Sequence, residues 1–305
     1  MTQTRKVLLV THTRRPDAVS ACQEALELLK QAGIVPVVPA DEMQELKAAA
    51  VDLAGVQTLG VEGHAEELEL AMVLGGDGTI LRAAEVVRDA QTPVLGINLG
   101  HVGFLAESER GDLVETVKRI AARDYVVSDR LTIEVSVIQE GQVVFRSWAL
   151  NESTVERAAA GRLLEIALEV DGRPLSTFGC DGIVLSTPTG STAHAFSAGG
   201  PVVWPSVEAL TVVPLSAHAL FSRPLVVGPD SKLAVEILSR STGHGVLWCD
   251  GRRSFDLAPG ARVEVRRSDK PVRLARLEQG SFTDRIVRKF GLPVAGWRGP
   301  EDANQ

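Results

Sequence analysis

The first third of the chain alternates short apolar runs with segments of helical periodicity. Residues 6–11 form an apolar, β-branched run that predicts a strand, and residues 34–38 form a second such run. Between them, apolar side chains recur at helical spacing, at Ala18, Cys22, Leu26 and Leu29. Asp17 is the expected N-cap of this helix, and Gly33 is its expected end. A β–α–β order of this kind predicts a parallel sheet with helices on its faces.

A third apolar run, residues 70–74, leads directly into Gly75-Gly76-Asp77-Gly78-Thr79. The apolar residues that follow are again spaced as in a helix: Ile80, Leu81, Ala84 and Val87. The glycines are therefore predicted to form the turn from a strand into a helix. A strand over 93–98, a second glycine-rich loop over 98–105 and a helix over 113–122 complete this half. In a doubly wound sheet, such loops lie together at the carboxyl ends of the strands.

The pattern changes at residue 129, after which apolar and polar positions alternate. Strands are predicted over 131–137, 142–150, 163–170, 182–186, 232–238, 246–249, 262–266 and 272–277. The second half is therefore expected to be mostly antiparallel β, with an interruption at 188–200. A short amphipathic helix is predicted near the end, over 283–290. The expected domains are residues 1–126, residues 127–280, and a C-terminal helix and tail over 281–305.

Composition narrows the class of protein. With 305 residues, 45% of them apolar and 23% charged, the chain is long enough for two ordinary globular domains. Its three cysteines are few and widely spaced, which favours a reducing cytoplasm over a disulfide framework or a zinc site. The net charge of −7 argues against nucleic-acid binding, because proteins that bind nucleic acids usually present a positively charged surface. No signal peptide or membrane-length apolar run is recognised, so no membrane partner is expected.

The turn at Gly75-Gly76-Asp77-Gly78-Thr79 suits the binding of phosphate. Unpaired N–H groups at a helix start attract anions, and glycines let the anion approach closely. Asp77 is informative because a carboxylate repels phosphate and must therefore serve another task. It could hold Mg²⁺ or orient a hydroxyl that attacks phosphorus. The alternative is a tight turn in which Asp77 merely caps the helix.

Three further stretches are candidates for ligand contacts. Residues 186–201 combine hydroxyls and glycines between a strand and a short helix, which lets a flat ligand lie against the main chain. The alternative there is a hydroxyl-rich turn with an N-capping box. Asn151-Glu152 is expected at the end of a strand, where the pair could bind a ribose or an adenine edge, although Asn there is usually a turn residue. Asp250-Gly251 is fully explained by a hairpin turn.

The sequence lacks the motifs that identify several other enzyme classes. No Gly-Lys dipeptide occurs, so there is no Walker A loop. Leu81 stands where a G-x-G-x-x-G fingerprint needs its third glycine. No H-E-x-x-H is present, and the histidines show no metal-ligand spacing.

Taken in order, the motifs resemble those of the NAD kinases. The first is the Gly75–Thr79 turn, which diacylglycerol, sphingosine and phosphofructo-type kinases share. Asn151-Glu152 and the block Thr187-Pro188-Thr189-Gly190-Ser191-Thr192-Ala193 follow, and the block is far more specific. The resemblance covers nearly the whole chain, and the sequence as a whole is similar to those of the actinobacterial members. It implies an N-terminal Rossmann-like α/β domain and a C-terminal all-β sandwich domain, with the dinucleotide in the cleft between them. It also implies that the C-terminal helix packs back on the first domain.

The resemblance also implies an activity, the phosphorylation of the adenosine 2′-hydroxyl of NAD to give NADP. Asp77 matches the proposed base of the family, which orients or deprotonates the acceptor hydroxyl. Gly75, Gly76, Gly78 and Thr79 are the implied contacts to the phosphate donor. The implied NAD contacts are Asp77, Gly78, Arg82, Asn151, Glu152, Arg162, Asp181, Thr192, Ala193, His194, Ala195, Phe196 and Ser197. His194 and Arg252 depart from the usual tyrosine and glutamine of the family.

Partners follow from the same resemblance. Mg²⁺ is expected to arrive with the phosphate donor and not on fixed protein ligands. ATP is the expected donor, and Gly179 stands where members that also use inorganic polyphosphate carry a small or polar residue. A homodimer or homotetramer is expected from the family alone.

Two rival functions remain open at this point. A lipid or sugar kinase would share only the glycine-rich turn, and a lipid kinase should show a membrane-facing stretch, which we do not find. A non-catalytic NAD(P)-binding sensor would gain nothing from the repulsion between Asp77 and a phosphate.

Overall fold

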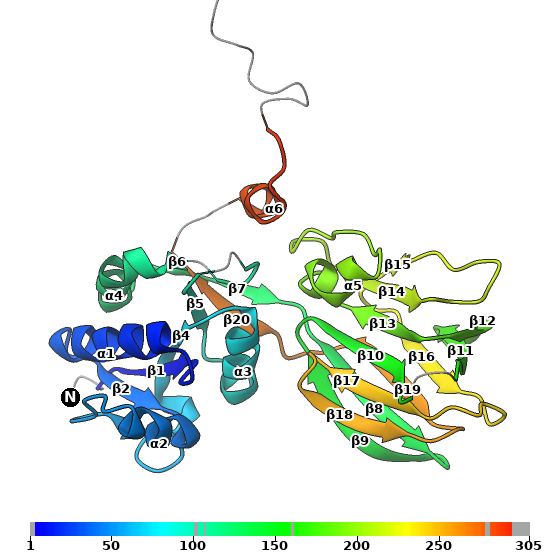
Figure 1. Cartoon of the computed structure of the whole chain (residues 1–305), viewed down its shortest axis with the longest axis horizontal. Helices are drawn as coiled ribbons and strands as arrows, with labels where there is room; N and C mark the ends of the chain where they lie inside the picture. The colour runs from blue at the N-terminus through cyan, green and yellow to red at the C-terminus, as the bar shows by residue number, and fades with distance from the viewer. Residues whose placement is uncertain (1–3, 101–102, 107, 160–161, 278–280, 295–305) are drawn as a thin grey trace, which may run out of the picture. The chain divides into compact units, whose positions relative to one another are not determined.

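The structure, a computed structural model, describes residues 4–100, 103–106, 108–159, 162–277 and 281–294. Contacts divide the chain into two compact units. The first unit comprises residues 1–129 together with 272–305, and the second comprises residues 130–271 (Figure 1). No helix in the described part of the chain is long and apolar enough to cross a membrane.

The first unit is built on a sheet of order β3-β2-β1-β4-β5-β20-β7, and β6 pairs with β5 beside this path. Its strands are β1 (Lys6–Thr11), β2 (Val35–Val38), β3 (Gln57–Thr58), β4 (Leu68–Leu74), β5 (Val94–Asn98), β6 (Ser108–Glu109), β7 (Val126–Arg130) and β20 (Val272–Arg276). The pairs from β3 through β1 and β4 to β5 and β20 are parallel, as the β–α–β pattern predicts.

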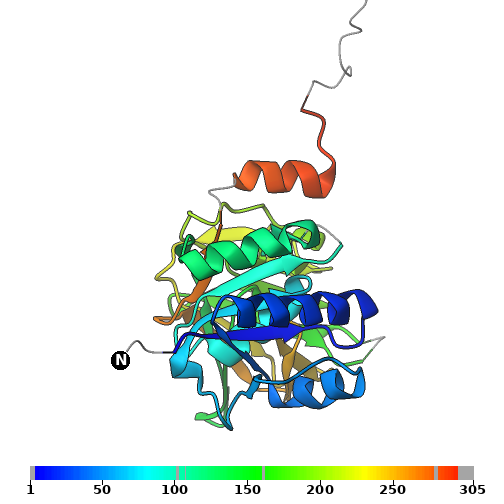
Figure 2. The ribbon, with the colours of Figure 1, turned by 90° about the vertical axis from the view of Figure 1, so that its left-hand side faces the viewer.

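Helices cover both faces of this sheet. They are α1 (Pro16–Gln31), α2 (Ala40–Ala48), α3 (Asp77–Val87) and α4 (Leu113–Ala122), followed at the chain end by α6 (Phe282–Phe290). The helices α1 and α4 lie side by side (Figure 2), and their apolar stripes bury against β1, β4 and β5. Asp17 is not the N-cap of α1. Arg15 takes that position because Pro16, with its fixed φ, occupies the first helical position, and Asp17 falls in the first turn.

The predicted strand over 272–277 forms, but its place differs from the prediction. It was expected among the antiparallel strands of the second half. Instead β20 runs parallel to β5 in the first sheet, with Leu274 paired to Val94 (Figure 1). Val272, Leu274 and Ala275 are buried. The sequence of an apolar strand does not indicate which sheet the strand will join.

The second unit is a sandwich of two antiparallel sheets, of orders β15-β14-β13-β10-β17-β18 and β12-β11-β16-β19-β8-β9. Its strands are β8 (Ile133–Gln139), β9 (Gln142–Ala149), β10 (Glu152–Arg157), β11 (Leu164–Val170), β12 (Arg173–Cys180), β13 (Gly182–Ser186), β14 (Leu210–Leu215), β15 (Leu225–Val227), β16 (Leu233–Ile237), β17 (Gly245–Cys249), β18 (Arg253–Leu257) and β19 (Arg262–Arg267).

The core of the second unit lies between its two sheets. Alternate residues of β8, such as Ile133 and Val135, meet residues of the opposite sheet, such as Val155 and Leu185. A short segment, α5 (His194–Ser197), covers the outer face of β13 and β14 through the buried Ala195. The predicted parallel-sheet domain, antiparallel domain and C-terminal helix are therefore confirmed.

Candidate active site

The glycine-rich turn joins the buried strand β4 to α3, as the sequence predicts. Gly75 is buried, and its N–H donates to the Ile97 carbonyl at 3.0 Å. Gly76 and Gly78 are exposed, with open space where a side chain would stand. Because the first N–H groups of a helix have no intrahelical acceptor, the start of α3 presents donors to an anion. Gly75 and the buried Thr79 shape the turn, whereas Gly76 and Gly78 form its open side.

Asp77 is the first residue of α3, and the main chain of the loop after β5 holds its carboxylate. The Phe104 N–H donates to Oδ2 at 3.1 Å, and the Leu105 N–H donates to Oδ1 at 3.2 Å. A Cβ atom at Gly103 would stand 2.3 Å from Oδ1, so a side chain there would displace the carboxylate. The second glycine-rich loop therefore lies beside the first and fixes the direction of Asp77.

Asn151 and Glu152 follow the end of β9, as the sequence predicts, and Glu152 is also the first residue of β10 in the second unit. The residue is only 8% exposed, and its Oε2 has no hydrogen-bond partner among the described residues. Burial, and after it the Asp250 carboxylate, raises the pKa of Glu152 to about 8 against an opposing bond from the His194 N–H. A buried acceptor without a donor is unfavourable, which makes this oxygen a natural partner for a ligand N–H or O–H.

Asp250 fixes the main chain just before Glu152. The predicted hairpin turn is present, with Asp250 at a φ of 52°. The side chain is nevertheless buried, and it accepts from the N–H groups of Leu150 at 3.0 Å and Asn151 at 2.7 Å. The Arg253 guanidinium donates to the same carboxylate at 2.8 Å. The prediction that a turn fully explains this residue is therefore wrong, because a turn motif does not reveal where its side chain points.

The hydroxyl-rich loop after β13 uses most of its hydroxyls internally. They donate to main-chain carbonyls at 2.5–3.3 Å: Thr187 to Leu150, Ser186 to Asn151, Ser191 to Pro188 and Thr192 to Thr189. Gly190 approaches the main chain so closely that a Cβ there would stand 2.0 Å from the Asn151 oxygen. These residues therefore build the shape of the loop and hold it against the segment that carries Asn151.

A cavity of about 280 Å³ lies beside Glu152. Its other lining residues are Thr154, Glu156, His194, Trp248 and Gly251. Thr154 Oγ1 donates to Glu156 Oε1 at 2.6 Å, and His194 Nδ1 lies 4.0 Å from the same oxygen. Trp248 is 37% exposed although it stands on a strand. Carboxylates suit ligand hydroxyls, and aromatic faces suit a flat ring.

Two family models match the chain. The ATP-NAD kinase N-terminal domain matches residues 7–125, and the ATP-NAD kinase C-terminal domain matches residues 150–277. The chain belongs to the NAD kinase family. Its predicted family and kinase class are therefore confirmed.

Similar curated proteins span nearly the full length of the chain. One named NAD kinase from Leifsonia xyli subsp. xyli is 62% identical over 301 residues, covering 99% of each chain. Another NAD kinase, from Thermobifida fusca, is 57% identical over 304 residues, covering 98% of this chain and 93% of its own length.

Two solved structures share the fold. A yeast NADH kinase in complex with NADH aligns at a TM-score of 0.84 and 22% identity, covering 96% of this chain and 89% of its own. An Archaeoglobus fulgidus NAD kinase in complex with ATP aligns at a TM-score of 0.65 and 26% identity, covering 94% and 98%.

Three of the charged side chains that the NAD kinase family suggests as contacts bind neighbouring groups of their own unit. Arg82 donates to Glu42 and to the Thr11 carbonyl, each at 2.6 Å. Burial raises the pKa of Glu42 to about 7, although Arg82 opposes that rise. Asp181 pairs with Arg157 at 2.9 Å. The exposed Arg162 donates to the Thr242 carbonyl at 3.0 Å.

The short helix α5 carries further residues that the NAD kinase family suggests as contacts, and these residues differ in burial. Ala195 is buried against Val184 and Val213 and anchors the segment. Phe196 and Ser197 are exposed, and His194 faces the cavity. Only part of the predicted run therefore borders the cavity itself.

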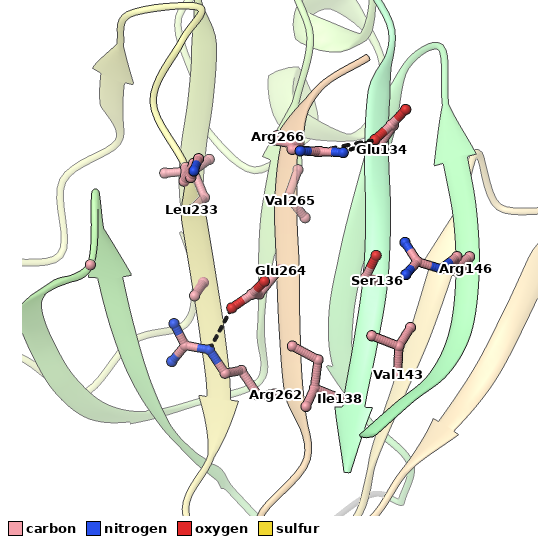
Figure 3. A pocket seen from close by; sticks show the side chains of 13 residues that line it. Glu134, Ser136, Ile138, Val143, Arg146, Leu233, Arg262, Glu264, Val265 and Arg266 are labelled. Atoms are coloured by element: carbon pink, nitrogen blue, oxygen red, sulfur yellow. Dashed lines mark hydrogen bonds and ion pairs between the residues drawn. The ribbon is translucent and has the colours of Figure 1, made fainter. Parts of the chain in front are cut away.

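A larger hollow of about 340 Å³ lies on the face of β8, β9, β16 and β19 (Figure 3). Two ion pairs lie in its lining: Arg262 with Glu264 at 3.0 Å, and Arg266 with Glu134 at 2.9 Å. Among the described residues that line this hollow, none has an orphaned buried acceptor like that of Glu152. We therefore do not assign the reaction to this hollow.

The part of the chain that the structure describes holds no cluster of three or more His, Cys, Asp or Glu side chains suited to a metal ion. Cys22, Cys180 and Cys249 are buried free thiols. Burial raises the pKa of Cys22 and Cys180 to about 12 and that of Cys249 to about 11, so these thiols stay protonated and unreactive near neutral pH.

Proposed function

We propose that this chain phosphorylates the adenosine 2′-hydroxyl of NAD to give NADP, with ATP as a phosphate donor. The observation that carries the proposal is the fixed carboxylate of Asp77 at the head of an open glycine turn. Phosphoryl transfer depends mainly on in-line positioning and on neutralising charge. A turn that offers N–H donors to phosphate, together with a carboxylate that cannot swing away, meets the first need.

Asp77 is assigned to the acceptor hydroxyl. Each of its oxygens accepts one main-chain N–H bond, which leaves further lone pairs for a ligand hydroxyl. The carboxylate orients this hydroxyl or takes its proton as the new P–O bond forms. Little base strength is required, because the transition state is loose.

The donor phosphates are assigned to the turn. Gly76 and Gly78 form its open side, whereas the N–H of Gly75 is already bonded to Ile97. We therefore assign direct contacts to Gly76 and Gly78, and a supporting role to Gly75 and Thr79. Mg²⁺ would enter with the donor, since Mg²⁺ commonly binds through the phosphates of a substrate and keeps several of its waters. When bound, it would neutralise charge on the phosphates.

The dinucleotide is assigned to the cavity beside Glu152. Its hydroxyls and amide supply the donors that Glu152 Oε2 lacks. Asn151, with its main chain fixed by Asp250, lies next to Glu152, and His194 offers a ring. Arg82, Arg162 and Asp181 remain proposed contacts that would first have to leave or share their present partners.

Inorganic polyphosphate is proposed as a second donor. A Cβ at Gly179 would meet only Leu163 atoms at 3.5 and 3.8 Å, which are ordinary contacts. Gly179→Arg should therefore fold, and the long cation should fix one donor geometry. We expect this variant to lose more activity with polyphosphate than with ATP. Equal losses with both donors would contradict the role given to Gly179.

The test of the function is direct. Purified protein is incubated with NAD, Mg²⁺ and either donor, and NADP is detected with an NADP-specific dehydrogenase. Formation of NADP in proportion to enzyme and time is the expected result. Binding of NAD without NADP formation would favour the sensor, and phosphorylation of a lipid or sugar would favour another kinase. A homo-oligomer and a cytoplasmic location stay predictions, to be checked by light scattering and fractionation.

A further inference from the structure

The C-terminal helix α6 contacts the loop that holds Asp77. Arg285, in the middle of α6, donates from its guanidinium Nη1 to the Phe104 carbonyl at 3.0 Å and to the Ala106 carbonyl at 3.2 Å. The loop residue Phe104 also places its ring near two rings of α6. Its centroid lies 6.1 Å from that of Phe282 and 5.9 Å from that of Phe290, within the range of favourable aromatic pairs.

A single peptide group joins Arg285 to Asp77. The Phe104 carbonyl, which accepts from Arg285, and the Leu105 N–H, which donates to Asp77 Oδ1, belong to the same peptide plane. That plane is rigid, and in the trans form its C=O and N–H point in opposite directions. A cationic donor on the carbonyl side therefore fixes the direction of the N–H and strengthens it as a donor.

The attachment of α6 does not depend on a buried apolar core. None of its residues is fully buried, and a helix of nine residues is marginal in isolation. Besides the Arg285 and ring contacts, Arg288 forms an ion pair with Glu109 at 3.3 Å, with both side chains more than 60% exposed. Exposed pairs contribute little. Arg285 and the three phenylalanine rings therefore supply contacts that hold the loop against α6.

We propose that α6 is a positioning element for the reaction, in which Arg285 fixes the Phe104–Leu105 peptide so that its N–H directs the Asp77 carboxylate. Arg285 is a positioning residue, not a catalytic one. The inference rests on the role proposed above for Asp77, and it adds that this role requires a helix some 180 residues beyond the Phe104–Leu105 peptide.

The test compares Arg285→Ala with Arg288→Ala, an exposed arginine on the same helix. Misplacing a reacting group can cost up to about 100-fold in rate. We therefore expect Arg285→Ala to lower kcat by about 10- to 100-fold, with KM for NAD within about threefold. Arg288→Ala should change neither. Arg285→Lys, which keeps a cationic donor, should recover part of the loss.

A double-mutant cycle separates positioning from a general loss of structure. In an Asp77→Asn background, Arg285→Ala should lower the remaining rate by no more than about twofold, since its effect acts through Asp77. Losses that multiply fully would overturn the proposal. So would wild-type kcat in Arg285→Ala.

Amide hydrogen exchange provides a readout that does not depend on activity. The Phe104 and Leu105 amides should exchange faster in Arg285→Ala than in the wild type or Arg288→Ala. If the purified protein forms no NADP, the proposed function fails while the exchange experiment still tests the contact. Should Arg285→Ala prove too unstable, Phe290→Leu should show the same change in exchange and kcat to a smaller degree.

Discussion

The two carboxylates Asp77 and Glu152 differ in how the protein satisfies them. Asp77 is partly exposed, and both of its oxygens accept main-chain N–H bonds. Glu152 is 8% exposed, keeps an oxygen without a partner among the described residues, and has the Asp250 carboxylate nearby. Main-chain N–H groups orient the Asp77 carboxylate, whereas a ligand donor would satisfy the free oxygen of Glu152. We therefore assign the rate of phosphoryl transfer to Asp77 and the affinity for NAD to Glu152.

The largest expected effect is that of Asp77→Asn. Turnover should fall about 10²- to 10⁴-fold, because a positioned carboxylate is lost, while the affinity for NAD should stay within a few-fold. Steady-state NADP formation and equilibrium binding of NAD provide the two values. Glu115→Gln, on the exposed face of α4, is the matched control. A variant that loses affinity and keeps turnover would reverse the roles of the two carboxylates.

Asp250→Asn should affect the surroundings of Glu152 and leave those of Asp77 unchanged. The Asn side chain retains one acceptor for the Leu150 and Asn151 N–H groups and loses the charge that pairs with Arg253. We expect a loss of about 1–3 kcal/mol in unfolding free energy, and a KM for NAD raised about tenfold. Thermal unfolding and kinetics measure both. Asp256→Asn, exposed on the same hairpin, should leave both unchanged, and an unaltered KM in Asp250→Asn would remove Asp250 from the site.

Glu152→Gln should change how stability depends on pH. Because the folded pKa is raised to about 8 from an ordinary 4.5, this group contributes stability that is present below about pH 4.5 and is lost as the pH rises through about 8. The free energy of unfolding of the wild type should therefore fall over this window by up to about 1.4 kcal/mol per pH unit from this group. Removing the titrating group should flatten the decline.

Glu42, with a pKa raised to about 7, adds a similar decline that Glu152→Gln leaves in place. The comparison is therefore between the variant and the wild type at each pH, with Glu140→Gln as an exposed control. Parallel curves for Glu152→Gln and the wild type would show that Glu152 titrates normally.

The smallest expected effect concerns Trp248. If a ring of the dinucleotide lies on its exposed face, NAD should quench its fluorescence, and Trp248→Phe should abolish most of the change that NAD causes. Since Phe keeps part of the stacking, KM for NAD should rise only about two- to fivefold. Trp204→Phe, at another exposed tryptophan of the same unit, should retain the quenching. Quenching that survives in Trp248→Phe would place the ring elsewhere.

Much of the fold could be predicted from periodicity and turn residues. The predicted ranges for β1, α4 and β13 agree with the structure at both ends, because each has a clear period and a sharp boundary. The placement of β20 could not be predicted, since β20 pairs with a strand about 180 residues earlier. Several strands of the second unit, among them β12 and β14, were missed because their apolar residues do not alternate strictly.

The candidate site was predictable where side chains carry the chemistry and unpredictable where the main chain does. Asp77 and Glu152 stand out in the sequence. The main-chain N–H groups of Phe104 and Leu105, which hold Asp77, cannot be recognised in the sequence, because every residue except proline has such a group. Asp250 was mistaken for a turn residue because its turn is real and its buried contacts are long-range. Trp248 could not be predicted as a site residue, because the sequence does not show which face of β17 borders the cavity.

The roles of Asp77 and Glu152 are tested most directly by measuring NAD binding and a single turnover on the same two variants. Asp77→Asn and Glu152→Gln are each titrated with NAD, then saturated with it and mixed with Mg²⁺ and donor. We expect Asp77→Asn to bind NAD within a few-fold of the wild type but to convert the bound NAD at least about 100-fold more slowly. Glu152→Gln should bind more weakly, and at saturation should convert bound NAD at close to the wild-type rate. Rapid conversion of NAD bound to Asp77→Asn would contradict the central claim that Asp77 serves the transfer step.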